Sequence, residues 1–158
     1  MRTPRPARPE KAAAVRAAVR DAYAPWVARI GREPGPMGDD YARRVADGQA
    51  WLVEDDGGRV VGVLVVQDDP GDSAALLLDN VAVVPAAQGR GVGRALIAFA
   101  EDETRRRGRD RVRLYTNALM AENVALYRRL GYAETARRRE AGFDRVFLEK
   151  RLAAAAPP

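Results

Sequence analysis

The sequence from Asn80 to Leu96, NVAVVPAAQGRGVGRAL, is the most informative about the fold, because it joins an apolar strand to a helix through three closely spaced glycines. The apolar run covers residues 74–84. A run of this kind predicts a central strand that is buried on both faces. Pro85 ends the strand, and the helix after the glycines is expected to run to about Arg107.

Gly89, Gly91 and Gly93 predict an anion site between this strand and the helix. Glycines let the backbone approach a ligand closely, and the first turn of a helix offers N–H groups and the positive end of the helix dipole. A phosphate or pyrophosphate is the expected guest, and Arg90 and Arg94 can add charge-assisted contacts. A glycine-rich turn without a ligand is the alternative.

Two common nucleotide-binding patterns do not fit this loop. The pattern G-x-G-x-x-G fails whether it is counted from Gly89 or from Gly91, because its third glycine would fall on Arg94 or on Leu96. The P-loop pattern fails as well, since no Gly-Lys-Ser/Thr follows. The loop therefore does not fit a Rossmann dinucleotide site or a P-loop.

Hydrophobic periodicity and turn residues predict the other elements. Helices are expected over residues 10–23, 25–30, 41–47 and 122–130, and strands over residues 51–54, 60–66, 111–116, 134–140 and 145–152. This order predicts an α/β fold of the α+β type with one central sheet. We expect a single domain over residues 10–152, a loose tail or short edge strand over residues 1–9, and a tail over residues 153–158.

The chain of 158 residues contains neither cysteine nor histidine. The missing cysteine excludes disulfides, thiolate metal sites and a cysteine nucleophile. The missing histidine removes the commonest general base and the commonest transition-metal ligand. Chemistry here must use carboxylates, tyrosine, serine, lysine, arginine, backbone amides or water, and no metal is expected.

The net charge is +5, and nearly all of the positive charge is arginine, with Lys11 and Lys150 as the only lysines. A basic protein attracts polyanions, so a nucleic-acid surface is one interpretation. Acidic residues are interleaved with the arginines along the chain, which favours ordinary solvated faces. We therefore expect no nucleic-acid partner.

The sequence has no uncharged apolar stretch of about 18 residues, which a membrane helix requires. Its basic N-terminus, MRTPRPARPEK, lacks the apolar segment of a signal peptide. We therefore expect a soluble cytoplasmic protein without a membrane partner.

The stretch over residues 80–96 and a second block, Asn123–Tyr132, together resemble the signature of the GNAT superfamily of N-acetyltransferases. The family has a strand ending in V-x-P or V-V-P, then Q/R-x-x-G-x-G/A and a helix, and residues 88–93, QGRGVG, match its fixed positions. The second block, NVALYRRLGY, is similar to the downstream A-x-x-x-Y-x-x-x-G-F/Y segment. The likeness covers roughly residues 50–150.

The resemblance implies a fold, a co-substrate and site residues. The expected fold is a central, mostly antiparallel mixed sheet of about six to seven strands flanked by about four helices. The expected co-substrate is acetyl-CoA, and Tyr127 matches the tyrosine that protonates the departing thiolate. Two groups of positions match the CoA-binding segments of the family. The backbone of the first group would pair with pantetheine, and this group is Val81, Ala82 and Val83. The second group is Gln88, Gly89, Arg90, Gly91, Val92, Gly93 and Arg94, and the amides of its last six residues would hold the pyrophosphate.

One position departs from the family pattern. Many members carry an asparagine seven residues before the tyrosine, in contact with pantetheine, and here that position is Met120. Asn123 lies one helical turn before Tyr127, and Asn117 ends the preceding strand, so either asparagine can take this contact.

The reaction needs a base, because an alkylammonium with a pKa near about 10.4 must lose a proton before it attacks a thioester. Asp79 is the leading candidate, since a carboxylate inside an apolar strand requires a function or a partner. A structurally paired carboxylate or a water chain is the alternative. Glu54 and Glu122 are weaker candidates, and the adjacent acids at 39–40 are candidates for recognition of a cationic amine.

Tyr127 also has a structural interpretation, because a tyrosine on an amphipathic helix usually buries its ring in the core and keeps its hydroxyl in contact with solvent. The family block favours catalysis instead. With no cysteine, direct transfer in a ternary complex is the simpler scheme, with proximity contributing much of the rate.

The segment Tyr23–Met37 is expected to cover the acceptor side, where Tyr23, Trp26, Met37 and Tyr41 either line a pocket or cap the core. We therefore expect acetyl transfer to an amine, which could be a small molecule, an amino-acid derivative or a protein amino group. A catalytically silent acyl-CoA-binding or regulatory domain is the alternative. Many relatives dimerise, so a homodimer is one possible assembly, and the sequence leaves the oligomeric state open.

Overall fold

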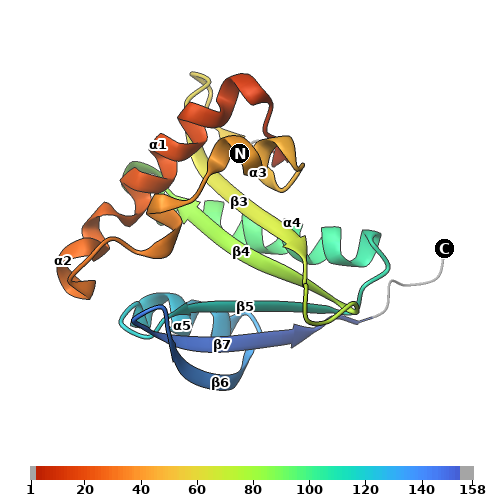
Figure 1. The fold of residues 1–158 in the computed structure, drawn as a ribbon. Helices are drawn as coiled ribbons and strands as arrows, with labels where there is room; N and C mark the ends of the chain where they lie inside the picture. Colours follow the sequence, from red (N-terminus) through yellow and green to blue (C-terminus); the bar gives the residue numbers. More distant parts are fainter. Residues whose placement is uncertain (1–2, 154–158) are drawn as a thin grey trace. The chain divides into compact units, whose positions relative to one another are not determined.

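The computed structural model describes residues 3–153, and these contain seven strands and five α-helices. The strands form one sheet in the order β1-β2-β3-β4-β5-β7-β6. Figure 1 labels the strands β3 to β7. Their bounds are β1 (Arg5–Pro6), β2 (Ala50–Glu54), β3 (Val60–Asp68), β4 (Ala75–Val83), β5 (Arg111–Asn117), β6 (Ala133–Glu140) and β7 (Phe143–Arg151). The helices are α1 (Ala12–Tyr23), α2 (Val27–Ile30), α3 (Tyr41–Ala46), α4 (Val92–Arg106) and α5 (Ala121–Arg129).

The sheet is mixed and mostly antiparallel. The pairs β1–β2, β2–β3, β5–β7 and β6–β7 are antiparallel, whereas β4 and β5 run parallel. The expected α/β fold with a mixed sheet is therefore confirmed, at the upper end of the expected number of strands. The helices also agree with the expected number of about four, since the fifth, α2, is a short helix of only four residues.

The chain forms two compact units. The first unit comprises Met1–Val66 with Asn80–Ala100, and the second comprises Gln67–Asp79 with Glu101–Pro158. The chain passes from one unit to the other within β3, β4 and α4. The predicted tail over residues 153–158 lies outside the described residues except for Ala153. None of the helices within residues 3–153 is both long and apolar enough to span a bilayer.

In the first unit, helix α1 buries one stripe of small apolar side chains, Val15, Ala18, Val19 and Ala22, at the spacing that the sequence predicted. The N-terminal strand β1 pairs with β2 and is tied down by charge as well. The carboxylate of Glu54 contacts Arg5 at 2.7 Å and Lys11 at 3.1 Å. Residues 1–9 therefore include an edge strand within the part of the chain that the structure describes.

A glycine in β3 brings strand and helix into close contact in the first unit. A Cβ atom at Gly62 would lie 2.8 Å from Cγ1 of Val92 and 3.1 Å from Cδ1 of Leu96. Val92 and Leu96 occupy the first and second turns of α4, and both are buried. Gly62 therefore lets the start of α4 lie directly on β3, which fixes where this helix begins.

In the second unit, β5, β7 and β6 are joined by local turns and long ladders. The β6–β7 hairpin turns at Ala141 and Gly142, whose φ angles are 51° and 79°. Two positive φ angles are typical of a tight hairpin turn whose twist matches the strands. The expected turn is thus present, although alanine rather than asparagine or glycine occupies its first position.

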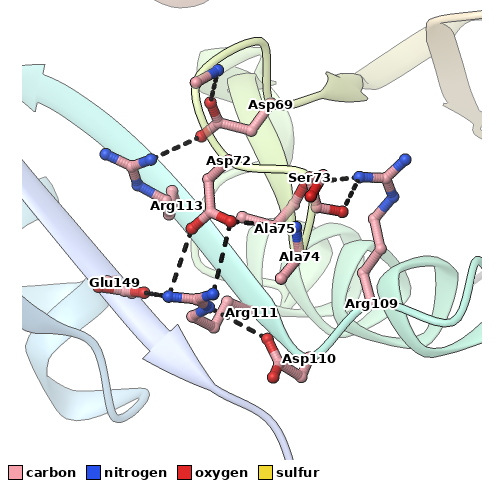
Figure 2. Close-up of polar contacts among 11 residues, drawn as sticks. Asp69, Asp72, Ser73, Ala74, Ala75, Arg109, Asp110, Arg111, Arg113 and Glu149 are labelled. Carbon is pink, nitrogen blue, oxygen red and sulfur yellow. Dashed lines mark hydrogen bonds and ion pairs between the residues drawn. The ribbon is translucent and has the colours of Figure 1, made fainter.

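The turn between β3 and β4 is held to the start of β5 by ion pairs within the second unit (Figure 2). Arg111 contacts Asp72 at 3.3 Å and Glu149 at 3.5 Å, and Arg113 contacts Asp69 at 3.3 Å. Arg109 adds a hydrogen bond from Nη1 to the carbonyl oxygen of Ser73 at 2.6 Å. These contacts lie beside the parallel pairing of residues 75–77 with residues 111–113, so the carboxylates of the turn help to set that register.

The contact at Gly62 gives a stability prediction. Gly62→Ala should lower the free energy of unfolding by about 1–3 kcal/mol, because the added methyl group overlaps Val92 and Leu96 in a packed core. Gly38→Ala is the matched control, since its Cβ would meet no atom within 4 Å and its φ is not positive. Urea unfolding of both variants tests this, and equal midpoints for the two would contradict it.

Candidate active site

The glycine loop has the backbone that an anion site requires. Gly89 and Gly91 have φ angles of 77° and 83°, a region that residues with a Cβ rarely adopt. The loop over residues 88–91 is exposed. Helix α4 begins at Val92, and the N–H of Ala95 donates to the carbonyl of Gly91 at 3.0 Å, so the N–H groups before Ala95 precede the hydrogen-bond ladder of the helix. The loop thus opens a helix N-terminus to solvent, and a backbone of this kind can bind a phosphate or pyrophosphate group.

Gln88 fastens this loop to the end of β4. Its Nε2 donates to the carbonyl oxygen of Val83 at 3.1 Å. The hydroxyl of Tyr23 lies 3.4 Å from the carbonyl oxygen of Val81. Both carbonyls belong to the stretch predicted to pair with pantetheine. Because a carbonyl oxygen can accept two hydrogen bonds, these contacts leave capacity for an extended ligand.

The predicted site residues are divided between the two units. Residues 81–83 and the loop over residues 88–94 belong to the first unit, whereas Asp79, Asn117, Asn123 and Tyr127 belong to the second. The structure therefore brings together the predicted pantetheine and pyrophosphate positions. Tyr127, the predicted acid, lies in the second unit together with the two candidate asparagines. The catalytic and binding roles of these residues stay predictions.

Tyr127 lies on α5 and is buried, with 8% of its surface exposed. Its ring meets that of Tyr132 edge to face, with centroids 5.6 Å apart and an interplanar angle of 71°. Burial raises the pKa of the Tyr127 hydroxyl above its ordinary value. The hydroxyl therefore stays protonated near neutral pH, which is the state that a proton donor requires.

The residues near the start of α5 differ in the burial and hydrogen bonding of their side chains. Asn117 accepts a hydrogen bond from the N–H of Leu119 on its Oδ1 at 2.9 Å, which closes a turn. Met120 is buried and directly precedes α5. Asn123 is half-buried and lies one turn before Tyr127. Asn117 is thus partly committed to a turn, and Asn123 shares the helical face of Tyr127.

Several candidate carboxylates have partners inside the protein. Glu54 binds Lys11 and Arg5, and hydrogen bonds from these two cations lower the pKa of its carboxyl group. Asp39 pairs with Arg44 at 2.9 Å. The side chain of Asp40 caps α3 by accepting the N–H of Arg43 at 3.1 Å. These contacts account structurally for three acids that the sequence had offered as bases or amine-recognising groups.

Asp79, the leading candidate base, is half-buried in β4. Successive side chains of a strand point to opposite faces, so Asp79 shares a face with residues 81 and 83 and lies opposite Asn80. Glu122 is exposed at the start of α5. Within residues 3–153, no group of three or more carboxylates could hold a metal ion.

The sequence analysis missed a polar cluster around Tyr132 in the second unit. Lys150 forms an ion pair with Glu101, which is buried on α4, and its ammonium lies 5.7 Å from the centre of the Tyr132 ring. The hydroxyl of Tyr132 is buried and has no hydrogen-bond partner among the residues that the structure describes. This cluster lies directly against Tyr127 through the ring contact.

The sequence analysis also treated Asn80 only as part of a motif. Asn80 is 4% exposed and hydrogen-bonds Tyr23 and Tyr41. Both partners are far from it in the sequence, so no local pattern indicates the contact. The sequence gives one weak indication of these hydrogen bonds. Asn80 is polar and lies inside an apolar strand, where a buried polar side chain needs a hydrogen-bond partner.

Known acetyltransferases are similar to this chain in sequence and in fold. Residues 46–134 match the family model described as acetyltransferase (GNAT) domain. Mycothiol acetyltransferase of Beutenbergia cavernae is 42% identical over 86 residues, which are 54% of this chain and 29% of that protein. This chain therefore matches less than a third of the length of that curated relative.

Solved structures share the whole fold. Ribosomal-protein-alanine N-acetyltransferase from Brucella melitensis aligns over 96% of this chain and 100% of its own, with 26% identity and a TM-score of 0.75. YncA from Salmonella typhimurium, whose structure contains its cofactor acetyl-CoA, aligns over 99% of this chain and 96% of its own, with 24% identity and a TM-score of 0.73. The family model covers more than half of the chain, so the chain belongs to the GNAT acetyltransferase family.

The buried hydroxyl of Tyr132 gives a second stability prediction. Tyr132→Phe should raise the free energy of unfolding by about 1 kcal/mol, because it removes a buried polar group that lacks a partner. Tyr41→Phe is the contrasting variant and should lower stability, since the hydroxyl of Tyr41 both donates and accepts a hydrogen bond. Thermal unfolding of both variants measures the difference. Destabilisation by Tyr132→Phe would show that the hydroxyl of Tyr132 makes a stabilising contact.

The raised pKa of Tyr127 gives a pH prediction. Because folding favours the protonated hydroxyl, Tyr127 should show no ionisation in the folded protein at the ordinary tyrosine pKa of about 10. Its contribution to stability should be present below about pH 10 and be lost as the pH rises further. Phenolate absorbance titrations of the wild type and of Tyr127→Phe should therefore coincide up to about pH 11. A difference between the two curves near pH 10 would show that Tyr127 is accessible to solvent.

Proposed function

We propose that this protein transfers the acetyl group of acetyl-CoA directly to an amine in a ternary complex. The observation that carries the proposal is the exposed loop at Gly89 and Gly91, which joins the end of β4 to the N-terminus of α4 with two positive φ angles. Membership of the GNAT acetyltransferase family supports the same conclusion.

The residues take the following roles in this proposal. Acetyl-CoA supplies a thioester whose carbonyl carbon accepts an amine. The backbone amides of residues 89–94 hold the pyrophosphate, and the backbone of residues 81–83 aligns pantetheine. Tyr127 gives its hydroxyl proton to the sulfur as the carbon–sulfur bond breaks.

The amine must lose one proton as its nitrogen attacks. Asp79, or water in contact with it, accepts that proton in the proposed scheme. Glu54 is a weaker base because Arg5 and Lys11 already bind its carboxylate. No acyl-enzyme step is included, since the chain has no cysteine.

The acceptor is proposed as a primary amine of a small molecule, an amino-acid derivative or a protein. The names of the relatives support both small and protein acceptors, since one is a mycothiol acetyltransferase and another a ribosomal-protein-alanine N-acetyltransferase. An α-amino group has a pKa near about 8, against about 10.4 for an alkylammonium. A chain without histidine therefore needs less help from a base when the acceptor is an α-amine.

A thiol-release assay tests the proposal. Wild-type protein is incubated with acetyl-CoA and an amine panel comprising a peptide with N-terminal alanine, an amino sugar and a polyamine, and CoA release is followed over time. Release that depends on one of these amines supports the proposal. Binding of acetyl-CoA without release to any amine would instead support the silent acyl-CoA-binding domain.

Tyr127→Phe separates chemistry from binding. This change should lower kcat by about 100-fold or more, because general acid catalysis contributes about that much. The Kd for acetyl-CoA, measured by calorimetry, should stay near the wild-type value. Gly91→Val is the matched binding variant and should weaken acetyl-CoA binding, since valine does not tolerate the φ of 83°. Full activity of Tyr127→Phe would exclude Tyr127 as the acid.

A further inference from the structure

A directed chain of hydrogen bonds crosses the interior of the first unit. The hydroxyl of Tyr23 donates to Oδ1 of Asn80 at 2.7 Å. Nδ2 of Asn80 donates to the hydroxyl of Tyr41 at 3.1 Å, and that hydroxyl donates to the carbonyl oxygen of Pro36 at 2.5 Å. Each donor in this chain has an acceptor, so the orientation of the Asn80 amide is fixed by its neighbours.

Burial makes this chain of hydrogen bonds specific. Asn80 and Tyr41 are 4% and 2% exposed. Loss of one partner would leave a buried donor or acceptor unsatisfied, which costs more than the net value of the hydrogen bond itself. The network therefore favours one placement of the segments that contribute to it.

The segments joined by the network are the two ends of one exposed stretch. Tyr23 is the last residue of α1, and Tyr41 is the first residue of α3. Between them lie residues 24–40, of which only Pro34 and Met37 are buried. This stretch overlaps most of the segment Tyr23–Met37, which is expected from the sequence to cover the acceptor side.

Arg20 adds a second attachment to the same stretch. Its Nη1 donates to the carbonyl oxygen of Met37 at 2.9 Å, and its Nη2 contacts Glu33 at 2.8 Å. The stretch over residues 24–40 is thus attached to α1 by Arg20 and to β4 by Asn80. With so few buried side chains of its own, it depends on these polar contacts for its position.

Asn80 connects this stretch to the proposed donor site. It directly precedes residues 81–83, whose backbone is the proposed pantetheine contact, and the hydroxyl of Tyr23 also lies 3.4 Å from the carbonyl oxygen of Val81. One side chain on β4 therefore sets the distance between the acceptor-side stretch and the strand that aligns the thioester.

We propose that Asn80, acting through Tyr23 and Tyr41, is a positioning residue that holds residues 24–40 in place for the acceptor amine. The proposal rests on the proposed acetyl transfer, which it deepens by assigning acceptor alignment to the buried network. Asn80 contacts neither substrate in this scheme. Displacement of the residues that position a substrate by about 1 Å weakens its productive binding, so the network affects the KM for the amine through geometry.

Kinetics of Tyr23→Phe test the proposal. The variant keeps the ring and removes the hydroxyl that bonds Asn80, so the fold should be retained. With the N-terminal alanine peptide, or the panel amine that reacts fastest, KM for the amine should rise about tenfold, which corresponds to the loss of one buried hydrogen bond. The Kd for acetyl-CoA should change less than twofold, or about 0.4 kcal/mol.

Val45→Ala is the matched control for simple destabilisation. Val45 is buried on α3, the helix that Tyr41 begins, but it has no polar group. This variant should lower the melting temperature and leave KM for the amine unchanged. Equal increases of KM in Val45→Ala and Tyr23→Phe would overturn the proposal, as would an increase in the acetyl-CoA Kd that matches the increase in KM.

Hydrogen exchange separates failure of this inference from failure of the proposed function. Amide exchange over residues 24–40 should be faster in Tyr23→Phe than in the wild type and than in Val45→Ala. If the wild type acetylates no amine, the acceptor role falls with the proposed function, whatever the exchange data show. If the wild type is active but exchange and amine KM are unchanged in Tyr23→Phe, the proposed function stands and the positioning role is refuted.

Discussion

The steric contact between Gly62 and the first turns of α4 is the constraint on which the candidate donor site depends. No side chain at position 62 lies between β3 and the helix, so Val92 and Leu96 pack against the strand itself. The helix must then begin at Val92, shortly after β4 ends, and the chain turns between them with positive φ at Gly89 and Gly91. The exposed N–H groups at this turn follow from packing in the core, before any ligand is considered.

Buried polar groups add specificity to this apolar frame in both units. In the first unit, the amide of Asn80 accepts and donates fixed hydrogen bonds, which distinguishes one arrangement of α1 and α3 on β4 from others that are equally apolar. In the second unit, the ion pair of Lys150 and Glu101 lies over Tyr132, whose ring contacts Tyr127. Each unit therefore contains a polar cluster that lies outside the predicted site. In each unit, this cluster packs beside a residue or segment to which the proposal assigns a function.

The sequence predicted the strands, the glycine loop and the family, because these depend on local periodicity and on spacing within a short stretch. It could not predict the partners of Asn80, since Tyr41 and Tyr23 lie 39 and 57 residues away. It also overlooked Glu101 and Thr104 on the buried side of α4, because polar residues do not register in a hydrophobic pattern. The cap formed by Asp40 and the ion pair of Asp39 with Arg44 required the fold, and the interpretation that these acids recognise an amine stays a prediction.

The absence of histidine shifts the proposed chemistry onto groups with fixed protonation states. Burial keeps Tyr127 protonated, so it holds the proton that the departing thiolate needs and cannot remove one from an amine. Glu54 has the opposite character, because two cations hold its carboxylate in the ionised form and lower its basicity. Under the proposed function, Asp79 and water are left to accept the proton of the amine. Carboxylates and water are in general weak bases. Correct placement of an already neutral amine therefore becomes more important, and this placement is the role assigned to the network around Asn80.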